Sequence, residues 1–193
     1  MRALVLVCSL KKSPAPSSSE LLGREILTAL ADHDVDGEVI RVADHDVKYG
    51  VTTDEGDGDA WPEIRTKLLG SDILVIATPI WMGQPASICK VVLERLDAEI
   101  GQPTMHGKVG VVGVVGNEDG AHHVTAEVFQ ALNDVGFTIP AGGGTYWVGE
   151  AMGKLDYADA GPKPETTGAA TKTLAAHAAH LAKLLADSPY KDD

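Results

Sequence analysis

Short apolar runs in this chain alternate with longer stretches in which apolar residues recur every three or four positions. The runs predict buried strands at residues 3–7, 38–42, 73–77 and 108–115, and a fifth strand within residues 137–148. The stretches between them predict amphipathic helices at residues 19–31, from near residue 60, at 86–96, through 124–135 and at 167–186. Gly136 ends the fourth helix, which has the clearest amphipathic pattern.

The regular alternation of strand and helix predicts a doubly wound parallel sheet with helices on both faces. A Rossmann domain would require the pattern G-x-G-x-x-G after the first strand, and residues 8–13 read C-S-L-K-K-S instead. This glycine-free loop favours the flavodoxin-like α/β fold, a five-stranded parallel sheet of order 2-1-3-4-5 that binds FMN beside its first and third strands. Without an interdomain linker, residues 1–193 are expected to form one FMN-binding domain.

Charge and cysteine content narrow the function classes. The net charge of −12 argues against partners such as nucleic acid or anionic lipid, although an electron-transfer partner could exploit an acidic surface. No apolar run approaches the roughly 20 residues of a membrane helix. The apolar run at residues 3–8 precedes Lys11 and Pro14 rather than a signal cleavage site. Cys8 and Cys89 lie in apolar segments, which indicates buried thiols in a reducing, cytoplasmic compartment.

A hydroxyl-rich loop follows the first strand, at the edge where parallel α/β sheets bind ligands. Backbone N–H groups at the start of the next helix would add to its hydrogen-bond donors, and this set suits a phosphate group. Because serine is also a good helix cap, an ordinary polar turn is the alternative. The residues that we assign to a phosphate site are Ser9, Lys11, Ser17, Ser18 and Ser19.

The segment A-T-P-I-W-M-G-Q-P at residues 77–85 follows the third strand and is the most informative part of the chain. Pro79 and Pro85 stiffen it, and Gly83 allows a ligand to approach the backbone closely. Trp81 thus lies on a stiff loop at the carboxyl end of a parallel strand, where flat cofactors bind. The two loops together predict one FMN, with its phosphate at the first and its ring at the second.

These motifs give the chain a resemblance to the flavodoxin-like NAD(P)H-dependent FMN reductases, a family that includes quinone and azo-dye reductases. The resemblance spans roughly residues 1–150 and rests on the serine-rich loop, on T-P-I-W-M-G-Q-P with Lys90 and Leu93 behind it, and on G-N-E-D-G at residues 116–120. One branch of the family adds an iron–sulfur cluster through a compact cysteine motif, which this chain lacks.

The resemblance also implies where the flavin ring lies. It places the isoalloxazine against a loop formed by Pro79, Ile80, Trp81, Met82, Gly83 and Gln84. On the other side of the ring it places Asn117, Glu118, Asp119 and Gly120. Trp81 would then stack on or border the ring, although a core or interface position is an alternative. The family usually forms homodimers, and Trp81, Met82 and Met105 are candidate contacts.

We therefore expect an FMN-dependent oxidoreductase in which NAD(P)H reduces FMN and a small acceptor, such as a quinone or a free flavin, reoxidises it. Hydride transfer to a flavin needs no catalytic nucleophile, and the chain contains no G-x-S-x-G motif. The alternatives are a flavodoxin-type carrier that serves protein partners and a flavin-free binding protein on the same fold. The sequence does not identify the acceptor or distinguish NADH from NADPH.

Two pairs of neighbouring residues have open roles. His122 and His123 would point about 100° apart on a helix, which disfavours a shared metal ion. They suit a solvent-facing helix start or the border of a substrate pocket. Tyr146 and Trp147 follow three glycines and either close the substrate face of the flavin or belong to an edge strand.

Overall fold

The computed structural model describes residues 1–162 and 164–191. Its strands are β1 (Arg2–Val7), β2 (Asp36–Arg41), β3 (Ile73–Trp81), β4 (Gln84–Pro85), β5 (Val109–Gly116) and β6 (Gly144–Val148). Its α-helices are α1 (Ser18–Ala31), α2 (Trp61–Leu69), α3 (Ser87–Arg95), α4 (Ala121–Asp134) and α5 (Glu165–Asp187). Short 3-10 helices form at η1 (Val42–Asp44), η2 (Asp97–Glu99) and η3 (Pro103–Met105).

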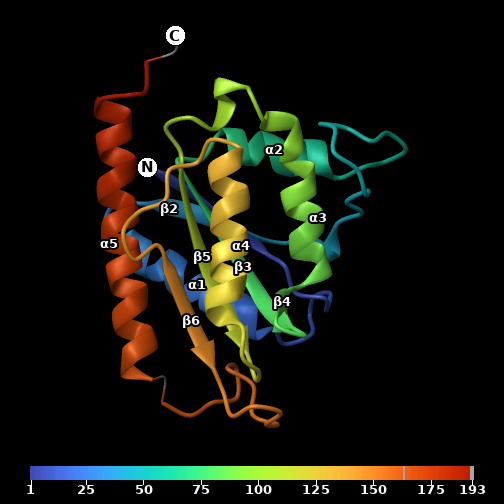
Figure 1. The fold of residues 1–193 in the computed structure, drawn as a ribbon, viewed down its shortest axis with the longest axis vertical. Helices are drawn as coiled ribbons and strands as arrows, with labels where there is room; N and C mark the ends of the chain where they lie inside the picture. The colour runs from blue at the N-terminus through green and yellow to red at the C-terminus, as the bar shows by residue number, and fades with distance from the viewer. Residues whose placement is uncertain (163, 192–193) are drawn as a thin grey trace.

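The parallel strands of the described ranges pair in the order β2-β1-β3-β5-β6 (Figure 1). With β5 and β6 as the fourth and fifth parallel strands, this is the predicted flavodoxin-like order 2-1-3-4-5, which is confirmed. The register sets Val7 beside both Arg41 and Ala77, and Gly116 beside Val148. The loops that follow these strands therefore meet at one edge of the sheet, toward which the arrowhead of β6 points in Figure 1.

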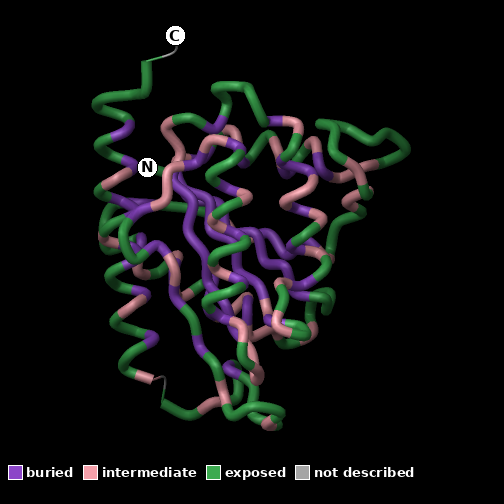
Figure 2. Tube along the Cα trace, in the orientation of Figure 1, coloured by how far each residue is buried: buried purple, intermediate pink, exposed green. Residues whose placement is uncertain are grey.

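Each strand contributes to two hydrophobic cores, because successive side chains point to opposite faces of the sheet. Leu6 and Ile76 belong to the core that α2, α3 and α4 cover. Val5 and Val75 belong to the core on the other face, beneath α1 and α5. Buried residues accordingly follow the strands, while the outer faces of the helices are exposed (Figure 2).

Gly23 lets α1 lie close to the sheet. A Cβ atom at this position would stand 2.8 Å from Val5 Cγ1 and 3.2 Å from Ala77 Cβ, both of which belong to strands. The close approach carries the amino terminus of α1 to the carboxyl edge of β1 and β3. Any larger residue would push the helix, and the serines at its start, away from this edge.

The structure corrects the prediction for the segment after the third strand. Residues 79–81 continue β3, and Trp81 pairs with Gln84 of β4 in a hairpin rather than a loop. Met82 and Gly83, the two turn residues, both have positive φ angles, of 54° and 74°. This pattern belongs to the tight turns whose twist matches that of paired strands. Trp81 therefore has a position fixed by strand pairing.

An ion pair fastens the long polar loop between β2 and α2. Arg95 of α3 contacts Asp59 at 2.7 Å, and both side chains are inaccessible to solvent. The same guanidinium donates hydrogen bonds to the carbonyl groups of Lys48 and Thr52 and lies over the ring of Trp61. Because an unpaired buried charge is costly, the pair couples the loop to the core.

A membrane-spanning helix would need a combination of length and apolarity that no helix in the described ranges has.

Replacing Arg95 by Met should lower the free energy of unfolding by about 3 kcal/mol at neutral pH, because Asp59 loses its partner. Burial alone would raise the pKa of Asp59, but hydrogen bonds from Arg95 and from backbone N–H groups lower it. The stabilisation by the Arg95–Asp59 pair is therefore fully present above about pH 4, the ordinary pKa of an aspartate in the unfolded chain. It is lost as the pH falls further. Urea unfolding at pH 7 and pH 3 should show the difference from wild type shrink at acid pH.

The control is Lys90→Met on the same helix. Lys90 is exposed and pairs with Glu94 at 3.6 Å, so its loss should change stability by less than about 0.5 kcal/mol. Similar losses in the two variants would contradict the role given to the buried pair.

Candidate active site at the carboxyl edge

A cleft of about 440 Å³ opens at the carboxyl edge of the sheet, within the volume range typical of small-molecule sites. Four segments line it: the loop after β1, the end of β3, the loop after β5, and β6 with the chain that follows it. The lining residues are Ser9, Leu10, Lys11, Pro16, Ser17, Ser18, Ser19, Pro79, Ile80, Trp81, Val115, Gly116, Asn117, Glu118, Trp147, Met152, Gly153, Asp156 and Tyr157.

All five residues predicted for the phosphate site line this cleft. Ser17 is the cap of α1: its Oγ accepts a hydrogen bond from the N–H group of Glu20 and lies 3.1 Å from Ser19 Oγ. Ser9 Oγ accepts from the N–H group of Lys11, and Ser18 Oγ from that of Ala158. A serine hydroxyl that accepts one bond still has its own proton to donate. The group thus combines hydroxyl donors, a lysine and a helix amino terminus, a donor set that suits an anion.

The hairpin of β3 and β4 contributes only part of the predicted ring site. Pro79, Ile80 and Trp81 line the cleft, and Trp81 is 53% exposed, so it is no core residue. Met82, Gly83 and Gln84 lie outside the lining. The backbone of Met82 and Gly83 contacts the loop after β5, and the side chain of Gln84 contacts His123 of α4.

Glu118 connects the hairpin to the loop after β5. Its carboxylate accepts hydrogen bonds from the N–H groups of Met82 at 3.1 Å and Gly83 at 2.9 Å. The two N–H groups of the hairpin turn are therefore held by a side chain of the protein itself. Glu118 also lines the cleft, so the same carboxylate borders any bound ligand.

The remaining residues predicted for this loop divide between wall and support. Asn117 lines the cleft, whereas Asp119 and Gly120 do not. Gly120 has a φ of 131° and packs directly on the backbone of Gly83. The buried Oδ1 atom of Asn117 accepts no hydrogen bond from the described residues. It is the kind of acceptor that an N–H group of a ligand would satisfy.

The segment at residues 149–160, called the strap below, completes the cleft. Met152, Gly153, Asp156 and Tyr157 line it, and sequence reasoning assigned none of them. Asn117 fixes the start of the strap: its carbonyl group accepts from Met152 N–H at 2.8 Å, and its Nδ2 donates to the carbonyl of Gly153 at 3.2 Å. The strap has no periodic pattern, so only the tertiary structure could place it.

Tyr157 anchors the far end of the strap. Its ring is buried against Trp147, with 5.4 Å between the ring centroids, and its hydroxyl donates to the carboxylate of Glu25 in α1. Burial and this hydrogen bond raise the pKa of Tyr157. The tyrosine therefore stays protonated and ties the strap to the helix that carries the serines.

The two open pairs of residues have separate positions. His122 contacts the ring of Tyr146, while His123 lies 3.3 Å from Glu127 and 2.9 Å from the side-chain amide of Gln84. Both histidines are exposed and neither lines the cleft. Trp147 does line it, whereas Tyr146 lies on the outer side of the same strand.

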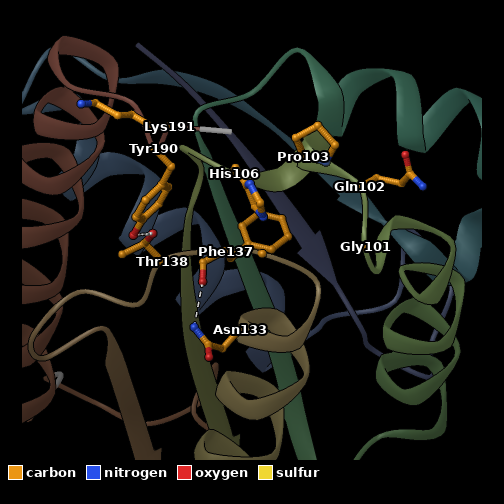
Figure 3. A pocket seen from close by; sticks show the side chains of 10 residues that line it. Gly101, Gln102, Pro103, His106, Asn133, Phe137, Thr138, Tyr190 and Lys191 are labelled. Carbon is orange, nitrogen blue, oxygen red and sulfur yellow. Dashed lines mark hydrogen bonds between the residues drawn. The ribbon is translucent and has the colours of Figure 1, made fainter. Parts of the chain in front are cut away.

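A larger hollow of about 700 Å³ lies near the other edge of the sheet, between the 101–106 segment, the end of α4 and the chain after α5 (Figure 3). Two pairs of its lining residues are within hydrogen-bond distance of each other. Thr138 Oγ1 lies 3.0 Å from the hydroxyl of Tyr190, and Asn133 donates to the carbonyl of Phe137. Because it lies away from the loops at the carboxyl edge, we place the active site in the smaller cleft.

The fold is flavodoxin-like, and its cleft lies at the switch point of the sheet. The sequence profile of the NADPH-dependent FMN reductases matches residues 1–153, and the chain belongs to this enzyme family. The family resemblance drawn from the motifs is thereby confirmed.

Individual relatives extend the similarity to the rest of the chain. The 8-demethyl-8-aminoriboflavin-5'-phosphate synthase of Streptomyces davaonensis is 32% identical over all of this chain and 81% of its own length. The crystal structure of RosB with bound 8-demethyl-8-formylriboflavin-5'-phosphate has a TM-score of 0.90 and 31% identity, covering 100% of this chain and 83% of that one. A Mycobacterium bovis protein named divalent metal cation transporter MntH is 33% identical over 96% of this chain, which spans only 29% of that protein.

Replacing Gly120 by Ala should separate the hairpin from the loop after β5. The new Cβ would stand 2.9 Å from Gly83 Cα, a backbone atom that cannot rotate away, and the φ of 131° is strained for alanine. We expect the free energy of unfolding to fall by about 1–3 kcal/mol, measured by urea unfolding. Gly168→Ala is the control, because nothing lies within 4 Å of that Cβ in α5. It should be neutral or stabilising; a stable Gly120→Ala variant would contradict the packing argument.

Proposed function

We propose that this protein is an FMN-dependent oxidoreductase that takes electrons from NADPH or NADH and delivers them to a small acceptor such as a quinone or a free flavin. The observation that carries the proposal is the cleft itself, in which the serine-rich loop and the aromatic end of β3 line one cavity. When bound, FMN would supply the hydride acceptor, so the protein needs to bind, orient and shield.

The serine-rich loop is proposed to hold the phosphate of FMN. Ser9, Ser17, Ser18 and Ser19 offer hydroxyl groups, Lys11 offers a positive charge, and α1 offers the N–H groups of its first turn. These groups converge on one end of the cleft because Gly23 brings α1 close to β1. A phosphate bound there would also gain from the positive end of the helix dipole.

The other lining segments are proposed to hold the flavin ring. Pro79, Ile80 and Trp81 form an apolar wall, and Trp147 adds a second aromatic side chain. The unpaired Oδ1 of Asn117 suits an N–H group on the ring's polar edge. We propose that Glu118 orients this edge while it keeps the Met82–Gly83 turn in place, and that Gln84, Asp119 and Gly120 act from outside the cleft.

A second function is favoured by the relatives that match the whole chain: this protein would modify a flavin phosphate rather than cycle it. Similarity at 31–32% identity extends past residue 153, where the family profile ends, and so includes Asp156 and Tyr157 of the strap. Two carboxylates, Glu118 and Asp156, line the cleft and suit proton transfer to or from a bound substrate. In this reading the flavin phosphate is the substrate, held by the same residues.

One experiment separates these functions. FMN-loaded protein is mixed anaerobically with NADPH, and separately with NADH, while the visible absorbance of the flavin is followed. A reductase should bleach the flavin band in a single two-electron step with at least one nucleotide. In a second step, the loaded protein is incubated with oxygen and an amine donor, and the flavin is extracted and its mass measured by mass spectrometry. A reductase should leave the mass of FMN unchanged.

Other outcomes have definite meanings. A changed flavin mass without bleaching would replace the reductase assignment by the flavin-modifying one. Reduction only by one-electron donors, with a stable semiquinone, would indicate an electron carrier of the flavodoxin type. Protein that binds no FMN at all would overturn the proposal.

We also propose a homodimer that pairs beside the mouth of the cleft. Trp81 and Met82 are exposed there, Met82 to 90%, whereas Met105 is fully buried in the core and is withdrawn as a contact. Sedimentation at micromolar concentration should give about twice the mass of one chain. Met82→Glu should shift the protein toward monomers, because it places charge in an apolar interface, and Leu184→Glu on α5 should not. A monomeric wild type would refute the proposal.

A further inference from the structure

A buried arginine lies behind the serine-rich loop without lining the cleft. Arg41 is the last residue of β2, and its side chain is only 8% exposed. Its Nη1 donates to the carbonyl groups of Ala15 at 2.7 Å and Lys11 at 3.4 Å. Its Nε donates to Glu20 of α1 at 2.7 Å. One guanidinium thus joins the beginning of the loop, its end and the first turn of the helix that follows.

These bonds set the direction of the loop's peptide groups. A carbonyl oxygen that points into the bound anion would repel it, and Arg41 draws two such oxygens to the back of the loop. In a trans peptide the N–H group points opposite to the carbonyl, so the N–H group of Lys12 is directed away from Arg41. The loop has little backbone bonding of its own in this stretch, where Ala15 N–H pairs with the carbonyl of Lys12.

A second side chain from the same end of β2 holds the middle of the loop. Asp44 of η1 accepts hydrogen bonds from the N–H group and the hydroxyl of Ser13, each at 2.7 Å. These bonds lower the pKa of Asp44, so it is ionised near neutral pH. Arg41 and Asp44 therefore fix three points of the loop from outside the cleft.

The charged groups around Arg41 balance one another. Arg41 and Arg24 both pair with the single carboxylate of Glu20. Burial alone would raise the pKa of Glu20, but the hydrogen bonds from Arg24 and Arg41 lower it. With the ionised Asp44, the two arginines and the two carboxylates carry no net charge, so Arg41 acts on a bound anion through the direction in which it holds the loop.

We propose that Arg41 is a positioning residue that makes the cleft selective for phosphorylated over unphosphorylated flavins. The inference rests on the proposed flavin binding and goes beyond it, since Arg41 does not itself line the cleft. It holds two carbonyl groups of the serine loop away from a phosphate bound in the cleft. Riboflavin, which lacks the phosphate, has nothing to gain from this arrangement.

The test compares dissociation constants for FMN and riboflavin, measured by quenching of flavin fluorescence. In Arg41→Met the FMN affinity should fall about 10–100-fold, the range expected for loss of a charge-assisted interaction, while riboflavin affinity changes less than about threefold. Arg41→Lys should recover part of the preference, because its ammonium group can still donate to a loop carbonyl but loses the fork of hydrogen bonds.

Arg24→Met is the matched control, since Arg24 also pairs with Glu20 but bonds to no loop carbonyl in the described structure. It should leave the ratio of the two affinities nearly unchanged. Asp44→Ala removes the second contact from an exposed position and should weaken FMN alone by about 3–10-fold; it decides the matter if Arg41→Met does not fold.

Equal losses for FMN and riboflavin, or an Arg24→Met effect as large as that of Arg41→Met, would overturn the inference while leaving flavin binding intact. A wild-type protein that prefers FMN no more than riboflavin would overturn it as well. If wild type binds neither flavin, the proposed function fails first and the role of Arg41 falls with it.

Discussion

Backbone groups at the carboxyl edge of this sheet must find hydrogen-bond partners where strand pairing has ended, and side chains provide them. Arg41 donates hydrogen bonds to two carbonyl groups of the serine-rich loop. Glu118 accepts from the N–H groups of the hairpin turn, and Asn117 bonds to both ends of a peptide segment in the strap. The shape of the cleft depends on these contacts, because the loops have little regular structure to keep them in place.

The same arrangement supports the proposal that one cleft holds a flavin mononucleotide from end to end. The proposed phosphate side is built by α1 and the loop before it, which the close packing at Gly23 brings to the sheet. Its apolar side is built by strand residues, so Trp81 and Trp147 stand on paired backbone rather than on free loops. A rigid scaffold of this kind limits the entropy lost when a flat ligand is bound.

Membership in the NADPH-dependent FMN reductase family does not decide whether this protein reduces its flavin or modifies it, and the strap bears on that question. In a reductase the flavin stays and a second molecule must reach its ring, whereas a flavin-modifying enzyme exposes one position of the flavin to its own acid–base groups. The strap brings Asp156 to the cleft and is tied down by Tyr157, Asn117 and Ser18. The family profile ends at residue 153, within the strap, whereas the similarity to RosB covers the whole chain.

The sequence by itself determined the fold, because strand and helix periodicity are local and the glycine-free first loop separates flavodoxin-like from Rossmann order. It also predicted that the serine loop, Pro79 to Trp81, Asn117 and Glu118 lie together, since loops after parallel strands must meet at one edge, and all of them line one cleft. The tertiary structure decided that Met82, Gly83, Gln84, Asp119 and Gly120 stand outside the cleft, because strand pairing extends β3 through Trp81 and turns the chain away. It also placed the strap and the buried ion pairs of Arg41 and Arg95, whose partners lie far away in the sequence and leave no periodic signal in it.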